Sequence, residues 1–167
     1  MWPFGRRKAD PSRDKFKAGT KALAKHDYLQ AVALLSEACQ ANPANAAAAA
    51  NLGIAYFGLG QYQAAAQHLQ RAREHDPRNP KILLNLAAAR NGLNEVDEAI
   101  SLLLKVLDLD PQHRDCHYNL ATAYWKQARV PEAMAELEME LALHPDHELA
   151  RQAAQRLRQE YGPPADA

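Results

Sequence analysis

Side chains that can bind a metal ion gather in two short segments of the chain. The segments HRDCH and HPDH contain His113, Asp115, Cys116, His117, His144 and His147. Two histidines four residues apart can share one helix face and bind zinc or another transition metal. However, His113 and His147 occupy equivalent loop settings, each shortly after a proline. Because a loop role explains them without a metal, we predict no metal site and no cofactor.

Three asparagines, Asn51, Asn85 and Asn119, recur at one fixed interval. The same interval separates His113 from His147. An asparagine amide is both donor and acceptor, so a regular row can pair with the backbone of an extended peptide and ignore its side chains. Asparagine is also a poor helix former. We interpret the row as a peptide-binding feature; the alternative is that asparagine is a tolerated polar residue on an exposed helix face.

Four prolines mark the same interval: Pro43, Pro77, Pro111 and Pro145. Aligning on them defines four repeats at 12–45, 46–79, 80–113 and 114–147. In each repeat an alanine precedes a leucine by four residues, as in Ala65 and Leu69. Small residues suit antiparallel helices that approach closely, and turn signals such as GLGQY interrupt the apolar helical period. Each repeat is therefore predicted to be a helical hairpin.

In this pattern the sequence resembles the tetratricopeptide-repeat (TPR) family. The signature residues of the second repeat are Leu52, Gly53, Tyr56, Ala65, Leu69, Ala72 and Pro77. The resemblance implies an all-α fold, a right-handed α-solenoid of four TPR hairpins with a C-terminal capping helix at 148–161. The apolar stripe of that helix is expected to be Leu149, Ala153, Leu157 and Tyr161. We expect a flexible basic and aromatic leader at 1–11 and a disordered tail at 162–167.

Some residues depart from the family pattern. Arg90 stands where the family usually has tyrosine, and Glu140 stands where a small residue is usual. Atypical residues are expected in terminal repeats, which face water on one side. Arg90, in a middle repeat, is not explained in that way.

The resemblance also implies that the first helix of each hairpin lines a concave groove. The expected peptide-binding residues are Asn51, Asn85, Asn119, Phe57, Trp125, Tyr118, Lys17, Lys81 and Lys126. Phe57 and Trp125 would form apolar pockets for side chains of the ligand. Tyr118 has the alternative role of packing between repeats, and the lysines that of a solvated helix face. Only Asn51 and Lys81 match the clamp that some TPR proteins use for a chaperone C-terminus, so that ligand is not favoured.

Composition excludes several classes of function. Lysine plus arginine equals aspartate plus glutamate, 20 against 20, so a nucleic-acid partner is not expected. Two cysteines more than two repeats apart indicate free thiols in a reducing compartment. No apolar run reaches the length of a signal peptide or a membrane span, so we predict a cytoplasmic protein. The sequence has no phosphate loop, nucleophile elbow or HExxH motif, and we predict that it is not an enzyme.

The sequence therefore predicts an adaptor or scaffold that binds an extended peptide segment of another protein. The alternative is a self-associating structural scaffold, a homo-oligomer. Membrane contact through residues 1–9, where Trp2 and Phe4 stand beside three basic residues, is a further alternative. A basic leader explains these residues without a membrane.

Overall fold

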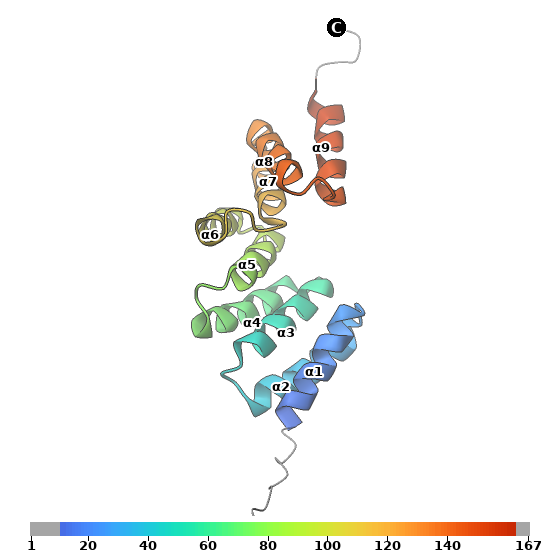
Figure 1. Ribbon diagram of the computed structural model, residues 1–167, viewed down its shortest axis with the longest axis vertical. Coiled ribbons are helices and arrows are strands. Elements are labelled where there is room, and N and C mark those ends of the chain that lie inside the picture. The colour runs from blue at the N-terminus through green and yellow to red at the C-terminus, as the bar shows by residue number, and fades with distance from the viewer. Residues whose placement is uncertain (1–10, 163–167) are drawn as a thin grey trace, which may run out of the picture. The chain divides into compact units, whose positions relative to one another are not determined.

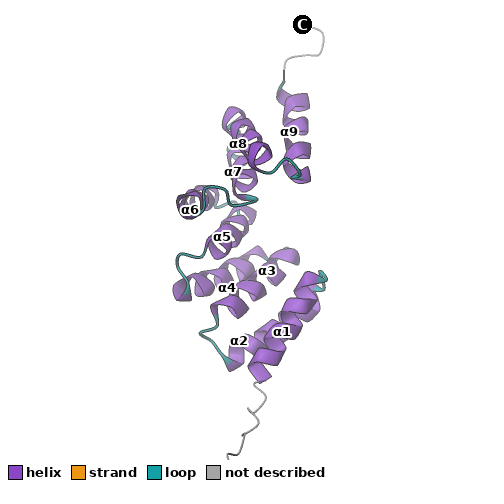
Figure 2. Ribbon diagram, in the orientation of Figure 1, coloured by secondary structure: helices purple, strands orange, loops and turns teal. Residues whose placement is uncertain are grey.

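The protein is α-helical throughout residues 11–162, the part of the chain that the computed structural model describes. Nine helices joined by short loops, and no strand, occur in this range (Figure 2). The predicted all-α repeat fold is confirmed. Residues 1–10 and 163–167, with most of the predicted leader and tail, lie outside the described residues. Between residues 11 and 162 no helix combines the length and the apolar character that crossing a bilayer requires.

The chain divides into two compact units, residues 1–77 and 78–167. Unit 1 contains α1 (Pro11–Ala24), α2 (Tyr28–Ala41), α3 (Ala46–Gly58) and α4 (Tyr62–His75). Unit 2 contains α5 (Pro80–Gly92), α6 (Val96–Leu109), α7 (Cys116–Lys126), α8 (Val130–Leu143) and α9 (Glu148–Tyr161). Within each unit consecutive helices pack against one another, and the first helices of neighbouring hairpins, α1 with α3 and α5 with α7, also touch (Figure 1).

The turn inside each hairpin uses one backbone geometry four times. The residues with positive φ are His26 (59°), Gly60 (72°), Asn94 (65°) and Ala128 (57°), and successive ones are one repeat apart. A left-handed conformation costs a residue with a Cβ about 1–2 kcal/mol, and only glycine adopts it freely. The repeat period is therefore imposed by backbone geometry as well as by packing.

Close approach of the paired helices follows from the small residues that recur in the repeats. The leucines 35, 69, 103 and 137 and the alanines four residues before them are all buried. A Cβ added to Gly53 would lie 2.6 Å from Leu69 Cγ, and one added to Gly19 would lie 2.6 Å from Leu35 Cγ. No side chain fits at these two positions of unit 1 without movement of the facing leucine.

Helix α9 packs on α8 through a face that matches the predicted stripe only in part. Leu157 is buried and Ala153 is partly buried against the same core, as expected, but Leu149 is 56% exposed and Tyr161 is 58% exposed. Ala150 and Ala154 are buried instead. The predicted four-residue stripe was wrong in register because alternating steps of four and three residues keep one helix face toward a neighbour more closely than equal steps of four.

Three of the first helices and α9 differ in how their N-termini are capped. Asn45, Asn79 and His147 precede α3, α5 and α9, and each accepts a backbone N–H with its own side chain. Asp115 precedes α7 in a left-handed conformation, φ 70°, and its side chain makes no such bond. Helix α7 therefore needs another partner for its first backbone N–H groups.

Candidate functional site

The first helices of unit 1 present one half-buried asparagine. Asn51 on α3 donates from Nδ2 to Thr20 Oγ1 on α1, across 3.0 Å. Lys17 is exposed on α1. Phe57, in the last turn of α3, is 37% exposed, and its ring centroid lies 5.4 Å from that of Tyr62. We call Lys17, Thr20, Asn51 and Phe57 the first-helix face of unit 1.

The first helices of unit 2 present a longer run of polar side chains. Asn85 Nδ2 donates to Lys81 O at 2.7 Å, and Asn119 Nδ2 donates to Asp115 O at 2.7 Å. Between α5 and α7, Asn91 Nδ2 donates to Thr122 Oγ1 at 3.0 Å. We call the following residues the first-helix face of unit 2: Lys81, Asn85, Asn91, Asn119, Thr122 and Lys126.

The three predicted asparagines share one arrangement. In each, Nδ2 donates to a neighbour, whereas Oδ1 has no partner among residues 11–162. For Asn85 and Asn119 the neighbour is a carbonyl, which cannot donate, so the amide orientation is fixed and Oδ1 is the free group. Asn85 and Asn119 thus each offer an oriented acceptor at the surface of unit 2, and Asn51 offers an amide group at the surface of unit 1.

The predicted aromatic residues are placed less uniformly. Trp125 on α7 packs against the core of α7, α8 and α9, and the guanidinium of Arg156 lies 4.8 Å from its ring centroid. Tyr118 packs on the same core, with its ring centroid 5.1 Å from that of His147. Burial, together with the charge of Asp115, raises the pKa of the Tyr118 hydroxyl. Phe57 is the most exposed of the three predicted aromatics.

Glu140 explains both its own departure from the pattern and the irregular start of α7. Its side chain on α8 is fully buried, and Oε1 and Oε2 accept the backbone N–H groups of Asp115 at 3.0 Å and Tyr118 at 3.3 Å. A carboxylate at a helix N-terminus is stabilised by the N–H groups and the helix dipole. Glu140 thus caps α7 from a neighbouring helix.

His147 joins this cluster to α9. Its Nδ1 accepts the N–H of Ala150 at 3.1 Å, and its Nε2 lies 2.7 Å from Asp115 Oδ1 and 3.7 Å from Glu140 Oε1. Asp115, Glu140 and His147 are the one set of possible metal ligands that converges within the described residues. Because each ligand atom already makes a hydrogen bond that caps or links a helix, the geometry is that of a structural cluster.

Of the residues that suggested a metal in the sequence, Asp115 and His147 converge with Glu140, whereas His113, Cys116 and His117 each have separate partners. His117 Nδ1 lies 2.6 Å from Glu136 Oε2, His113 Nδ1 lies 2.8 Å from Arg114 O, and Cys116 Sγ donates to Leu103 O at 3.4 Å. Burial, with the nearby carboxylates of Glu140, Glu136 and Asp110, raises the pKa of the Cys116 thiol to about 12. That thiol is protonated at neutral pH.

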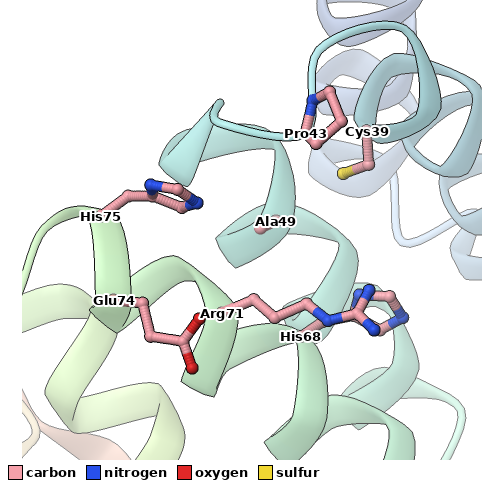
Figure 3. Close-up of a pocket in the computed structure, with 7 residues that line it drawn as sticks. All are labelled: Cys39, Pro43, Ala49, His68, Arg71, Glu74 and His75. Carbon is pink, nitrogen blue, oxygen red and sulfur yellow. The ribbon is translucent and has the colours of Figure 1, made fainter.

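A cavity of about 290 Å³ lies on unit 1, and none of the three asparagines lines it. It is lined by Cys39, Pro43, Ala49, His68, Arg71, Glu74 and His75, from α2, the following loop, α3 and α4 (Figure 3). Burial raises the pKa of Cys39, and Arg71 opposes that shift. Burial and Arg71 both lower the pKa of His68. The cavity therefore holds a neutral thiol and a neutral imidazole beside a cation, a set that sequence inspection missed because three helices supply it.

The repeats of this chain match known family models. Tetratricopeptide-repeat family models match residues 16–80 and 51–114, and a second such model matches residues 93–157. The chain belongs to the tetratricopeptide-repeat family. The predicted family is confirmed, and TPR proteins are typically non-enzymatic modules for protein interaction. Comparison with curated proteins gives no match.

Solved TPR structures match most of the chain. MamA is 21% identical, with a TM-score of 0.76, over 92% of this chain and 84% of MamA. YrrB, described as a TPR protein with an unusual peptide-binding site, is 26% identical, with a TM-score of 0.76, over 89% of this chain and 76% of YrrB. The first TPR domain of Spaghetti (RPAP3), solved with the HSP90 peptide SRMEEVD, is 22% identical, with a TM-score of 0.68, over 72% of this chain and 96% of that domain.

Arg90, at the usual tyrosine position of the TPR pattern, closes the hairpin of α5 and α6. Its Nη1 lies 2.6 Å from Glu95 Oε2, and its Nε lies 3.3 Å from Glu98 Oε1. The second contact is an ion pair without the alignment of a hydrogen bond. At this position, ion pairs between Arg90 and two glutamates of α6 and its N-terminus therefore replace the packing of an aromatic ring.

Sequence inspection did not single out the threonine partners of the TPR asparagines. Thr20 and Thr122 stand at equivalent positions of the first and fourth repeats, and each accepts an asparagine amide from a neighbouring first helix. Their shared position in the repeat was a sequence signal that could have indicated a common role. Threonine is common on exposed helices, however, and its hydrogen-bond partner depends on how the helices pack.

Proposed function

We propose that the protein is an adaptor or scaffold that binds an extended segment of a partner protein on the first-helix faces of its two units. The observation that carries the proposal is the state of the three asparagines. Each amide nitrogen is held by its own protein, and each Oδ1 remains free to accept a backbone N–H of a ligand. Asn85 and Asn119 offer two such acceptors within unit 2, one repeat apart in the sequence, which suits a ligand whose backbone presents several N–H groups.

Likeness to peptide-binding TPR proteins supports the proposal. YrrB is described as having a peptide-binding site, and the RPAP3 domain was solved with a bound peptide. Asn51, Asn85 and Asn119 would bind the backbone. Phe57, Trp125, Tyr118 and the lysines 17, 81 and 126 would select side chains.

The test is affinity capture from an extract of the native cells. Asn51→Ala combined with Asn85→Ala should abolish capture of the partner, because two amide groups that would bind its backbone are lost, while circular dichroism and melting temperature stay unchanged. The matched control is Gln63→Ala with Gln67→Ala, which removes two exposed amides from the second helix α4 and should leave capture intact. Retained binding by the asparagine variant would dismiss the model.

Charge distribution favours a second candidate function, self-association into a structural scaffold. Residues 1–77 hold ten lysines and arginines against six aspartates and glutamates, whereas residues 78–167 hold ten against fourteen. Opposite charges on the two halves favour contact between the first half of one copy and the second half of another. Light scattering across a concentration series at low and high salt separates the candidates, since an adaptor stays monomeric and charge-driven association weakens with salt.

A further inference from the structure

Asn91 on the first-helix face of unit 2 carries a buried acceptor without a partner. The residue, in the last turn of α5, is only 9% exposed, and its Oδ1 accepts no hydrogen bond from the described residues. A buried amide oxygen left unpaired costs about 1–3 kcal/mol, so native proteins rarely keep one without a use. The corresponding residue of unit 1, one repeat earlier, is Phe57, which has no such group.

Thr122 fixes which end of the Asn91 amide is free. Its hydroxyl donates its one proton to Asn119 O at 2.8 Å, so toward Asn91 it can only accept. Asn91 must therefore present Nδ2 to it, as the 3.0 Å contact shows. Turning the amide over would set Oδ1 against an oxygen that has no proton to give.

Lys126 on the neighbouring first helix contacts the same residue. Its ammonium donates to the backbone oxygen of Asn91, and the lysine is an exposed residue of α7. Among residues 11–162 its side-chain contact is with this carbonyl, and no carboxylate forms an ion pair with it. Because the charge is held by a single carbonyl, a carboxylate brought by a ligand would draw the ammonium away from the backbone oxygen of Asn91.

We propose that Asn91 Oδ1 accepts a backbone N–H of the partner while Lys126 binds an aspartate or glutamate beside that N–H. This inference rests on the proposed function and adds a chemical class to it, an extended peptide with an acidic residue. A lysine or arginine of the partner is a poor donor for Asn91 because the Lys126 ammonium repels it at short range. Unit 2 thereby selects for acidic segments at a place where unit 1 offers a phenyl ring.

The experiment begins with selection of a random dodecapeptide library on the full chain. The tightest selected peptide is synthesised with fluorescein, and its affinity is measured by anisotropy after N-methylation of each backbone amide in turn. On the wild type, one N-methyl group should weaken binding about tenfold, the worth of one hydrogen bond. On Asn91→Ala that particular penalty should vanish.

A second arm tests the acidic residue of the peptide. Its replacement by the amide, Asp by Asn or Glu by Gln, should weaken binding to the wild type about fivefold and leave binding to Lys126→Ala unchanged. Lys105→Ala, an exposed lysine on α6, is the matched control and should keep the wild-type penalty. Each comparison uses two peptides on one protein, so a partly unfolded variant does not distort the ratio.

The outcomes separate this inference from the proposed function. If every N-methyl penalty is equal on the wild type and Asn91→Ala, the inference is overturned, and Oδ1 is satisfied by water or by Lys126 itself. Under that result the proposed function stands if Asn85→Ala with Asn119→Ala still abolishes peptide binding. Selection that yields no peptide dependent on any of these asparagines overturns both.

Discussion

The hairpin of α3 and α4 in unit 1 and the hairpin of α7 and α8 in unit 2 close the same helix end by different means. In unit 1, Asn45 Oδ1 accepts the N–H of Ala48 at 3.0 Å, and the second helix places the small Ala72 opposite. In unit 2, Glu140 stands two repeats after Ala72, at the same point of the repeat, and accepts two N–H groups of α7 from across the hairpin.

The origin of the cap, either the preceding loop or the facing helix, determines which helices depend on one another for stability. When the cap comes from the preceding loop, the facing position of the second helix can hold a small apolar residue. A cap from the facing helix makes α7 depend on α8, and His147 extends that dependence to α9 through its contacts with Asp115 and Ala150. Unit 2 should therefore lose more stability than unit 1 when one polar side chain is removed.

Removal of Glu140 should have the largest effect. Glu140→Ala leaves the N–H groups of Asp115 and Tyr118 without their acceptor and should lower the free energy of unfolding by about 3 kcal/mol. Urea unfolding followed by circular dichroism measures the change. Glu138→Ala, an exposed neighbour on α8 paired with Arg158 at 3.4 Å, is the control and should cost less than about 0.5 kcal/mol. Equal losses in the two variants would show that Glu140 is not a cap.

Alkaline pH should weaken unit 2 through Cys116. The folded pKa, raised to about 12, exceeds that of an unfolded thiol near 9, so above pH 9 the unfolded chain binds fewer protons than the folded one. Stability should be complete below pH 9 and fall above it with a slope that approaches about 1.4 kcal/mol per pH unit, for a loss of about 2 kcal/mol at pH 10.5.

The alkaline slope can be assigned with two cysteine variants. Urea unfolding at pH 8, 9.5 and 10.5 measures how the free energy of unfolding depends on pH. In Cys116→Ala most of this alkaline slope should disappear. Cys39→Ala in unit 1 should retain it, because Cys39 is only partly buried and Arg71 opposes the rise of its pKa. A slope of the same size in Cys116→Ala would place the titrating group elsewhere.

The smallest effect is expected at the turn that both units share. Ala128 in unit 2 adopts φ 57°, where Gly60 in unit 1 adopts 72°. Ala128→Gly should raise the free energy of unfolding by about 1 kcal/mol, and Gly60→Ala should lower it by about as much. Differential scanning calorimetry detects both. A Cβ at Gly60 meets nothing within 4 Å, so its change reports the backbone conformation and the entropy of the unfolded chain without a steric clash.

Much of the fold could be predicted from the sequence because local rules repeat. Prolines, alanines and leucines at one interval predict helical hairpins, and the burial of Leu35, Leu69, Leu103 and Leu137 agrees with that prediction. The face of α9 was not predictable to one residue, since its stripe depends on how α8 approaches. Arg90 and Glu140 looked like exceptions because their partners lie on the other helix of each hairpin.

The candidate site divides in the same way. Sequence alone determined the family, the repeat length and the recurrence of Asn51, Asn85 and Asn119. This is because helices that pack in the same way in each repeat require similar residues at the same interval. Tertiary structure decided which amide atom is bonded and which is free, because that depends on neighbours brought by other turns and helices. Thr122 and Asn91 are far apart in the sequence, and only folding brings them within hydrogen-bond distance and leaves Asn91 Oδ1 without a donor.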